Sequence, residues 1–332
     1  MNFTGKRVFV TGATGFVGRH LVRRLCSLGA QVTALVRKSS DCSVLPPEVR
    51  MVTGDLASAD FACGETGRAL AASDCVVHCA ALLFARDWQD YMRGNVLSAR
   101  HLARAVAAHV KKPCRVLLVS SLAAAGPCAH APGKGEEEPA SPVSAYGWSK
   151  FLAEQAMGAC LGGHSLVVIR PPIVYGPEDR ALLPYFKLAA KGFVFSPGLR
   201  AVPMSFLFVD DLVNAMLLCL GESASGVYHI EDGRPSSMRG FGRLIALAAG
   251  RRALCIPLPQ ILVQTVAGVG NLVARCFSSF FPLTPDKALE GRQSGWLADG
   301  ARIRRELGFT PGLSPEEGVA RTLSAYQGEQ GR

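Results

Sequence analysis

The chain has 332 residues, of which 49% are hydrophobic and 19% are charged. This is the composition of a globular protein, and the length suits one large domain or two unequal ones. The net charge of +10 raises the question of nucleic acid, but the basic residues are spread along the chain and form no aromatic-interleaved stripe. We therefore expect no nucleic-acid binding and a generally basic surface.

The cysteine content and the N-terminal sequence predict the cell compartment in which the protein is located. The chain has 11 cysteines, an odd number, and no C-x-x-C pair. This usage predicts buried free thiols in a reducing compartment and no metal site. The first residues, MNFTGKRVFVTG, lack the apolar core of a secretory signal, so we expect a cytoplasmic location.

One uncharged segment, residues 253–274, is long enough to span a membrane. Side-chain amides dilute it, and prolines interrupt its start. We expect a buried or pocket-lining helix in preference to a span. Peripheral membrane contact through residues 253–281 is the intermediate alternative.

Taken in chain order, the first half alternates short apolar runs with helical patterns. Strands are predicted over residues 7–12, 31–37, 49–56, 74–81, 114–121 and 165–170, and helices over residues 16–28, 88–110 and 146–160. The apolar runs are continuous, which is typical of strands buried on both faces. Alternating strands and helices predict an α/β fold with a Rossmann-type doubly wound parallel sheet over residues 1–170.

The second half is less regular. Residues 170–179 are turn-forming, residues 205–220 predict a strand that leads into a helix, and residues 226–230 predict a short strand. We expect residues 171–332 to form mainly a smaller, mixed substrate-binding part at the carboxyl edge of the sheet. Some of its elements should return to the sheet.

The first predicted strand ends in the glycine-rich stretch TGATGFVG. Gly12 permits a tight turn, Gly15 lets the backbone approach a pyrophosphate, and Gly18 allows close packing of helix and strand. The start of the following helix offers free N–H groups and a positive dipole end to phosphates. We expect a dinucleotide at these glycines and at Thr14, Phe16 and Val17. A flexible turn without a ligand is the simpler alternative.

The spacing G-x-x-G-x-x-G resembles that of the extended branch of the short-chain dehydrogenase/reductase superfamily. That branch includes NAD-dependent epimerases/dehydratases and 3β-hydroxysteroid dehydrogenase-like enzymes. The stretches GDL, HCAA, PPIVYG and VDD extend the resemblance over nearly the whole chain. It implies adenine contacts from Asp55 and Leu56, phosphate and ribose contacts from Ala80 and Ala81, and nicotinamide contacts from Pro171, Ile173 and Val174.

The end of the second predicted strand bears on the choice of dinucleotide. Its sequence LVRKSS places Arg37 and Lys38 where an NAD-selective site has a carboxylate for the ribose 2′-hydroxyl. Cations there suit a 2′-phosphate, so the sequence favours NADP over NAD. If Arg37 instead stacks on adenine, either cofactor would fit.

The stretch SAYGWSK carries Tyr146 and Lys150 on one face of a predicted helix. A free tyrosine titrates near 10, and a nearby cation lowers that pKa and makes the phenol a better base. The resemblance implies that Ser121, with Ser120 as the fallback, orients the substrate oxygen toward Tyr146. It also implies that Lys150 contacts the nicotinamide ribose, and it gives Asn95 a lower-ranked supporting role.

The prediction of the substrate class rests on the residues at the start of the strand that precedes VDD. Many sugar-nucleotide enzymes of the branch have Arg-Asp there, whereas this chain has Met204 and Ser205. This favours a lipophilic alcohol or ketone, as in hydroxysteroid dehydrogenases or carbonyl reductases. A sugar-nucleotide epimerase or dehydratase is the first alternative, with Arg200, Arg239 or Arg292 as the phosphate ligand. A non-catalytic NADP-binding regulator is the second. The resemblance also implies a homodimer through residues 88–110 and 146–160.

Overall fold

The computed structural model describes residues 2–198, 200–259, 265 and 284–330. At its centre is a seven-stranded sheet in which all neighbouring strands are parallel. From edge to edge its strands are β10 (Gly226–His229), β6 (Ser165–Arg170), β5 (Arg115–Val119), β4 (Cys75–His78), β1 (Arg7–Thr11), β2 (Gln31–Val36) and β3 (Arg50–Thr53). The strand order reverses between β1 and β4, which confirms the predicted doubly wound Rossmann-type fold. The carboxyl ends of these two strands flank the position where such folds bind ligands.

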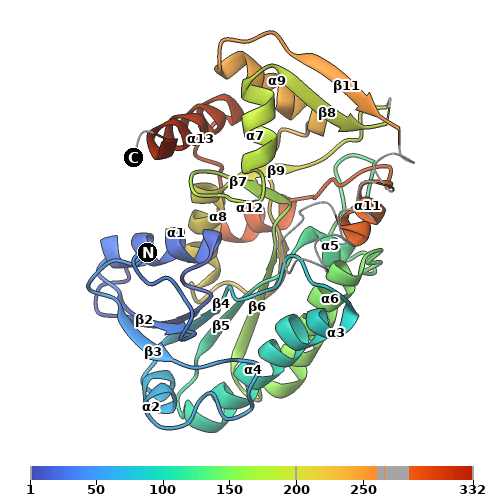
Figure 1. Ribbon diagram of the computed structural model, residues 1–332. Helices are drawn as coiled ribbons and strands as arrows, with labels where there is room; N and C mark the ends of the chain where they lie inside the picture. The colour runs from blue at the N-terminus through green and yellow to red at the C-terminus, as the bar shows by residue number, and fades with distance from the viewer. Residues whose placement is uncertain (1, 199, 260–264, 266–283, 331–332) are drawn as a thin grey trace.

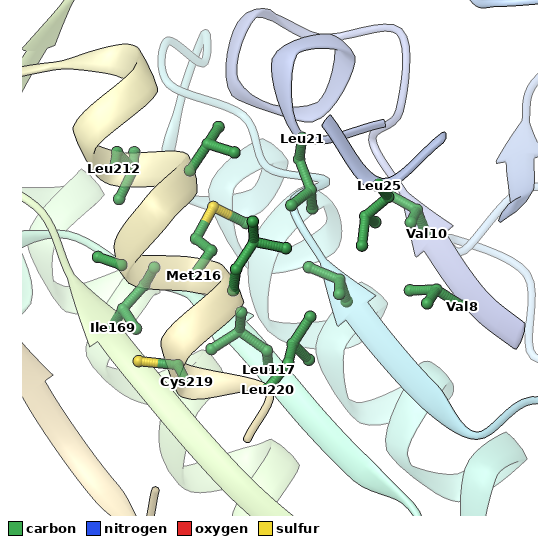
Figure 2. Packing of buried hydrophobic residues seen from close by; sticks show 14 of the residues in the cluster. Val8, Val10, Leu21, Leu25, Leu117, Ile169, Leu212, Met216, Cys219 and Leu220 are labelled. Atoms are coloured by element: carbon green, nitrogen blue, oxygen red, sulfur yellow. The ribbon is translucent and has the colours of Figure 1, made fainter. Parts of the chain in front are cut away.

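Alternate residues of each strand face opposite helical layers, because successive side chains point to opposite faces. Val8 and Val10 face α1 (Phe16–Ser27), α8 (Val209–Cys219) and α12 (Ala301–Leu307), where Leu21 of α1 and Met216 of α8 complete a buried apolar cluster (Figure 2). Phe9, between the two valines, belongs instead to a second buried cluster. That cluster includes side chains of α2 (Glu65–Ala71), α4 (Ser98–His109) and α6 (Ala145–Cys160).

The predicted helix over residues 88–110 is helical throughout but not uniform. It consists of α3 (Trp88–Tyr91), a π-helical turn η1 (Met92–Leu97) and α4. Asn95 lies in the π-helical turn and is buried. Such turns are rare and occur frequently at functional sites.

The C-terminal part lies beyond the carboxyl edge of the sheet, at the end of the molecule opposite to α2 in Figure 1. Its described elements are β7 (Ile173–Tyr175), α7 (Leu183–Ala190), β8 (Phe193–Pro197), β9 (Phe206–Phe208), α9 (Met238–Ala248), β11 (Leu254–Leu258), α11 (Pro285–Glu290) and α13 (Pro315–Gln330). The short helix α5 (Leu122–Ala125) follows β5. β10 pairs with β6, so this stretch of the second half does return to the main sheet.

Two details of the second half differ from the prediction. Residues 173–175 were expected in a turn, but they form β7 and pair with β9. Residues 254–258 were expected in a helix, but they form β11 and pair with β8. Pro257 lies within that run and lacks the N–H that a helix interior needs. Most of the uncharged segment 253–274, and of the proposed membrane contact 253–281, lies outside the described residues. None of the helices described here has the length and apolar character needed to cross a membrane.

Candidate active site

The glycine-rich turn packs too tightly for side chains at two of its glycines. Gly12 has φ +70°, and a Cβ there would lie 2.5 Å from the backbone nitrogen of Ala80 at the end of β4. A Cβ on Gly18 would lie 2.1 Å from the carbonyl oxygen of Gly12. Gly15 is exposed and caps the start of α1, whose first turn has no acidic residue. The turn therefore presents bare backbone beside a helix N-terminus, which fits the pyrophosphate of a dinucleotide.

An arginine holds this turn in place. The Arg19 guanidinium donates from Nη2 to the carbonyl of Thr14 at 2.7 Å and from Nε to that of Gly15 at 3.3 Å. Its Nη1 lies 3.4 Å from Glu178, a residue with φ +67° in the turn after β7. Sequence reasoning missed this link, because Glu178 lies 159 residues further along the chain. Phe16 and Val17, between Gly15 and Gly18, are half-buried.

The residues predicted for the adenosine end lie on the loops after β2, β3 and β4. Arg37 and Lys38 follow β2 directly, and both side chains are exposed. The Asp55 carboxylate accepts a hydrogen bond from the Ala57 backbone nitrogen at 3.0 Å and remains exposed. The Leu56 side chain is buried in the apolar cluster around Phe9. Ala80 is half-buried against Gly12, and Ala81 is exposed.

Tyr146 and Lys150 lie on the inner face of α6, and both are buried. Lys150 Nζ donates to the carbonyl of Val119, at the end of β5, at 2.8 Å. Ser121 caps α5, and its hydroxyl accepts from the Ala123 backbone nitrogen at 3.2 Å. The Ser121 hydroxyl also interacts with the Tyr146 hydroxyl and favours the phenolate. The structure thus brings together the three residues predicted to react.

The protonation of Tyr146 differs from the expectation. Burial raises the pKa of Tyr146 above its ordinary value, Ser121 lowers it in part, and the charge of Glu290 raises it further. Burial lowers the pKa of Lys150 to about 8, although Glu154 and Cys79 act in the opposite direction. The sequence predicted a tyrosine with a lowered pKa. That prediction is wrong for this structure, because desolvation of the phenolate outweighs the opposing interaction.

The loop after β6 adjoins the same site. Pro171 is buried, and its carbonyl accepts from the Leu122 backbone nitrogen, next to Ser121, at 2.8 Å. Ile173 and Val174 follow in β7 and are half-buried. The segment predicted for the nicotinamide end is therefore held against the segment that carries Ser121.

Asn95 and His78 have supporting positions. The Asn95 amide bonds both the N–H and the carbonyl of Leu82, at 2.7 and 3.1 Å, and donates to the Ser149 hydroxyl on α6 at 2.8 Å. His78 is buried, with Nδ1 2.7 Å from the Thr11 hydroxyl, and burial lowers its pKa to about 3. His78 is thus a neutral core residue near pH 7.

A helix far along the chain holds the start of α6. The Asp286 carboxylate of α11 accepts from the backbone nitrogens of Ala145 and Tyr146 at 2.6 and 3.0 Å. Glu290 accepts from the Ser144 hydroxyl at 2.6 Å. The Lys287 ammonium lies 4.3 Å from the centre of the Tyr146 ring. Sequence reasoning missed all three α11 residues, since nothing local to either segment predicts the contact.

The inner face of α6 also carries a buried ion pair, about two helical turns beyond Tyr146. Glu154 accepts from Arg170 Nε at 3.0 Å and Nη2 at 2.6 Å, and it also accepts from the Ser120 hydroxyl. Arg170 Nη1 lies 3.4 Å from His229, whose pKa burial lowers to about 4. This network engages Ser120, the fallback residue, at Glu154 and leaves Ser121 as the serine beside Tyr146.

Besides the charged residues of α11, apolar and aromatic side chains also pack around Tyr146. Tyr91 and Ala123 form a buried cluster with it, and Trp296 packs against this cluster. Met204 is buried and pairs through its backbone with Ser236. Of the three candidate phosphate ligands, Arg200 and Arg292 are exposed, and Arg239 bonds the Ser196 hydroxyl at 3.4 Å.

Comparison with known proteins agrees with this geometry. The family described as "NAD dependent epimerase/dehydratase family" matches residues 8–230. A ceramide reductase of Caulobacter vibrioides is 32% identical over 269 residues, which cover 77% of this chain and 75% of that protein. The 4-hydroxy-2-methyl-3-oxo-4-farnesyl-3,4-dihydroquinoline-1-oxide ketoreductase of Stigmatella aurantiaca is 29% identical over 338 residues, 98% of each chain.

Among solved structures, a UDP-glucose 4-epimerase of Thermotoga maritima superposes with a TM-score of 0.78. The two chains are 20% identical, and the match covers 98% of this chain and 99% of the other. This match supports the fold. The family match, together with the glycine-rich turn, shows that the chain is an enzyme of the NAD(P)-dependent dehydrogenase, reductase or epimerase type. It belongs to the NAD dependent epimerase/dehydratase family, in the extended branch of the short-chain dehydrogenases/reductases.

Proposed function

We propose that the chain interconverts a ketone and a secondary alcohol on a lipophilic substrate with NADP as cofactor, and that it favours reduction. The observation that carries the proposal is the arrangement of Tyr146 and Ser121, whose hydroxyls interact in a buried site where burial raises the pKa of Tyr146 and so favours the protonated phenol. A protonated phenol is ready to act as a general acid. A general acid is what reduction of a carbonyl requires at the oxygen.

In this proposal the chain's own residues handle the oxygen and the proton. The Ser121 and Tyr146 hydroxyls bind the substrate carbonyl oxygen, and Tyr146 donates its proton as negative charge develops there. Lys150, with a pKa lowered to about 8, holds its ammonium one helical turn away. That charge favours the phenolate left after proton transfer. When bound, the nicotinamide supplies or accepts the hydride.

The preference for NADP rests on Arg37 and Lys38. Both are exposed directly after β2, the strand beside β1 and its glycine-rich turn. Two cations there favour a ribose 2′-phosphate over a free 2′-hydroxyl. Replacing Arg37 by alanine should therefore weaken NADPH binding by about tenfold or more and change NADH binding little. Arg24→Ala, which removes an exposed cation of α1, is the matched control.

The lipophilic substrate class rests on the side chains packed around Tyr146, on Met204 and on the relatives. The groups nearest to Tyr146 include aromatic rings, and Met204 is buried in the position predicted for a phosphate-binding arginine. The names of two relatives specify ceramide and a farnesyl-bearing quinoline, and both names specify reduction. A sugar-nucleotide epimerase is the alternative, which the description of the matching family supports.

Steady-state assays on one panel of substrates separate these functions. Purified protein is given NADPH or NADH with a long-chain ketone, a 3-ketosteroid and UDP-glucose. We expect NADPH oxidation with the lipophilic ketones, lowered about 10²- to 10⁴-fold in Tyr146→Phe. Tyr228→Phe is the control, because it removes a hydroxyl that bonds Glu306 at the β10 edge of the sheet.

Two results would contradict the proposal. Interconversion of UDP-glucose and UDP-galactose, without reduction of lipophilic ketones, would identify an epimerase. Tight NADPH binding without turnover of any member of the panel would favour the regulator.

We also propose that the chain forms a homodimer through α3, α4 and α6. Trp88 of α3 and Trp148 of α6 are both 44% exposed, which is unusual for so large an apolar side chain. Light scattering after size exclusion tests this, and Trp148→Glu should give a monomer. Leu247→Glu, on α9, is the control.

A further inference from the structure

The positive charge of the chain is concentrated in two segments of the C-terminal part. Residues 181–209 and 233–285 contain nine of the 36 basic residues and none of the 26 acidic ones. The remainder of the chain thus has 27 basic and 26 acidic residues and is close to neutral. This corrects the expectation of an evenly basic surface. The described parts of these segments include α7, β8, α9 and β11, at the end of the molecule farthest from the main sheet (Figure 1).

Large apolar side chains are exposed at the same end. Leu247 near the end of α9 is 73% exposed, and Leu254 at the start of β11 is 59% exposed. Leu188 of α7 and Phe193 of β8 are 42% and 44% exposed. Single exposed apolar residues are ordinary, but a group of four on one small unit calls for a partner.

Two of the apolar residues, Phe193 and Leu254, lie side by side and close to basic residues. Leu254 is the register partner of Phe193 in the β8–β11 pair, and its backbone nitrogen donates to the carbonyl of Gly192 at 2.7 Å. A Cβ on Gly192 would lie 2.8 Å from the Arg252 carbonyl oxygen. Lys191, Arg251 and Arg252 are exposed on either side of this junction. We call this group the distal patch: four apolar residues (Leu188, Phe193, Leu247, Leu254) and three basic ones (Lys191, Arg251, Arg252).

We propose that the distal patch binds the surface of an anionic lipid membrane. Large apolar side chains enter the boundary between headgroups and acyl chains, while neighbouring cations pair with anionic headgroups. The absence of acidic residues in both segments suits such a surface, since a carboxylate there would be repelled. Two acidic residues border this unit: Asp232 and Glu316 line a pocket with Leu244 and Leu247 of α9, and Glu316 lies 3.7 Å from Arg234. This proposal does not depend on the substrate or cofactor assigned above.

Vesicle flotation of the full chain tests the proposal without substrate or cofactor. One set of vesicles is phosphatidylcholine alone, and the other contains about one-third phosphatidylglycerol. The chain should float with the anionic vesicles only, and about 0.5 M salt should release most of it. Reversing two charges with Arg251→Glu and Arg252→Glu should lower the partition coefficient about tenfold or more. Leu247→Ser with Leu254→Ser should also lower it severalfold.

The matched control reverses two exposed cations elsewhere. Arg68→Glu on α2 with Arg104→Glu on α4 makes the same change in net charge. This variant should bind anionic vesicles within about twofold of wild type, and circular dichroism checks that all variants are folded. Equal loss in the control and in the Arg251/Arg252 variant would overturn the proposal, as would failure of wild type to float. Unchanged binding in either distal variant would also overturn it.

Discussion

The buried ion pair between Glu154 and Arg170 leads to a prediction about the free energy of unfolding, which a double variant tests. Replacing one partner leaves the other charge without its counter-ion in a site where the two side chains are only 4% and 7% exposed. Glu154→Leu should lower the free energy of unfolding by about 3–5 kcal/mol. Arg170→Met should cost less at low pH, because the remaining carboxyl can take up a proton whereas a guanidinium cannot lose one.

The double variant separates the loss of a partner from the value of the pair itself. With Glu154→Leu and Arg170→Met together, neither charge of the pair remains, so the free energy of unfolding should return to within about 1–2 kcal/mol of wild type, although the buried Lys150 ammonium loses the favourable charge of Glu154. Ser120 and His229 lose a partner in this variant, which limits the recovery. The measurement is equilibrium unfolding in urea, followed by circular dichroism at pH 7.

The control is an ion pair of similar length on the surface. Arg50 and Glu65 lie 2.9 Å apart, and their side chains are 57% and 59% exposed. Arg50→Met should cost no more than about 1 kcal/mol. If Glu154→Leu costs as little as Arg50→Met, or if the double variant is as unstable as Glu154→Leu, the reasoning from burial is refuted.

Three further predictions concern the site. Gly18→Ala should weaken NADPH binding by at least about tenfold in a fluorescence titration, because its Cβ would lie 2.1 Å from a backbone oxygen; Gly163→Ala, with nothing within 4 Å, should bind normally. Ketone reduction should slow as the pH rises through about 8, where Lys150 loses its proton; a flat profile from about pH 6 to 10 would contradict this role. Lys287→Met removes a cation that lies 4.3 Å from the centre of the Tyr146 ring and that favours the phenolate. This variant should therefore raise the pH at which alcohol oxidation reaches half its maximum by about one unit or less. Lys287→Arg should restore the wild-type pH profile.

Much of the sheet could be predicted because its signals are local. A strand buried on both faces needs a continuous apolar run, and each of the first six predicted strands has one. β8 and β11 lack that signal, since each is a short strand that contains proline and is stabilised by its partner. The π-helical turn at Asn95 was also missed, because an i to i+5 turn leaves the helical pattern nearly unchanged.

The features of the candidate site likewise divide into those that a local sequence pattern predicts and those that only the fold produces. Gly12, Gly15 and Gly18 lie close together in the sequence, so their spacing alone predicts the turn. The protonation of Tyr146 could not be predicted, because it depends on burial, which is a property of the assembled core. The contact of Asp286 with the nitrogen of Tyr146 joins residues 140 apart, and only the fold brings them together.

The helix that positions Tyr146, α11, also contributes to its protonation, although burial is the larger cause. Asp286 and Glu290 place carboxyl groups at the start of α6, where free N–H groups and the helix dipole favour negative charge. The negative charge of Glu290 also raises the pKa of Tyr146, because it disfavours a second anion nearby. One of the acids that hold α6 in place, Glu290, thus adds to the effect of burial, which is the larger cause of the raised pKa of Tyr146. In the proposed reduction, a tyrosine held in this way starts as the proton donor, and it becomes a base only after a substrate oxygen has taken its proton.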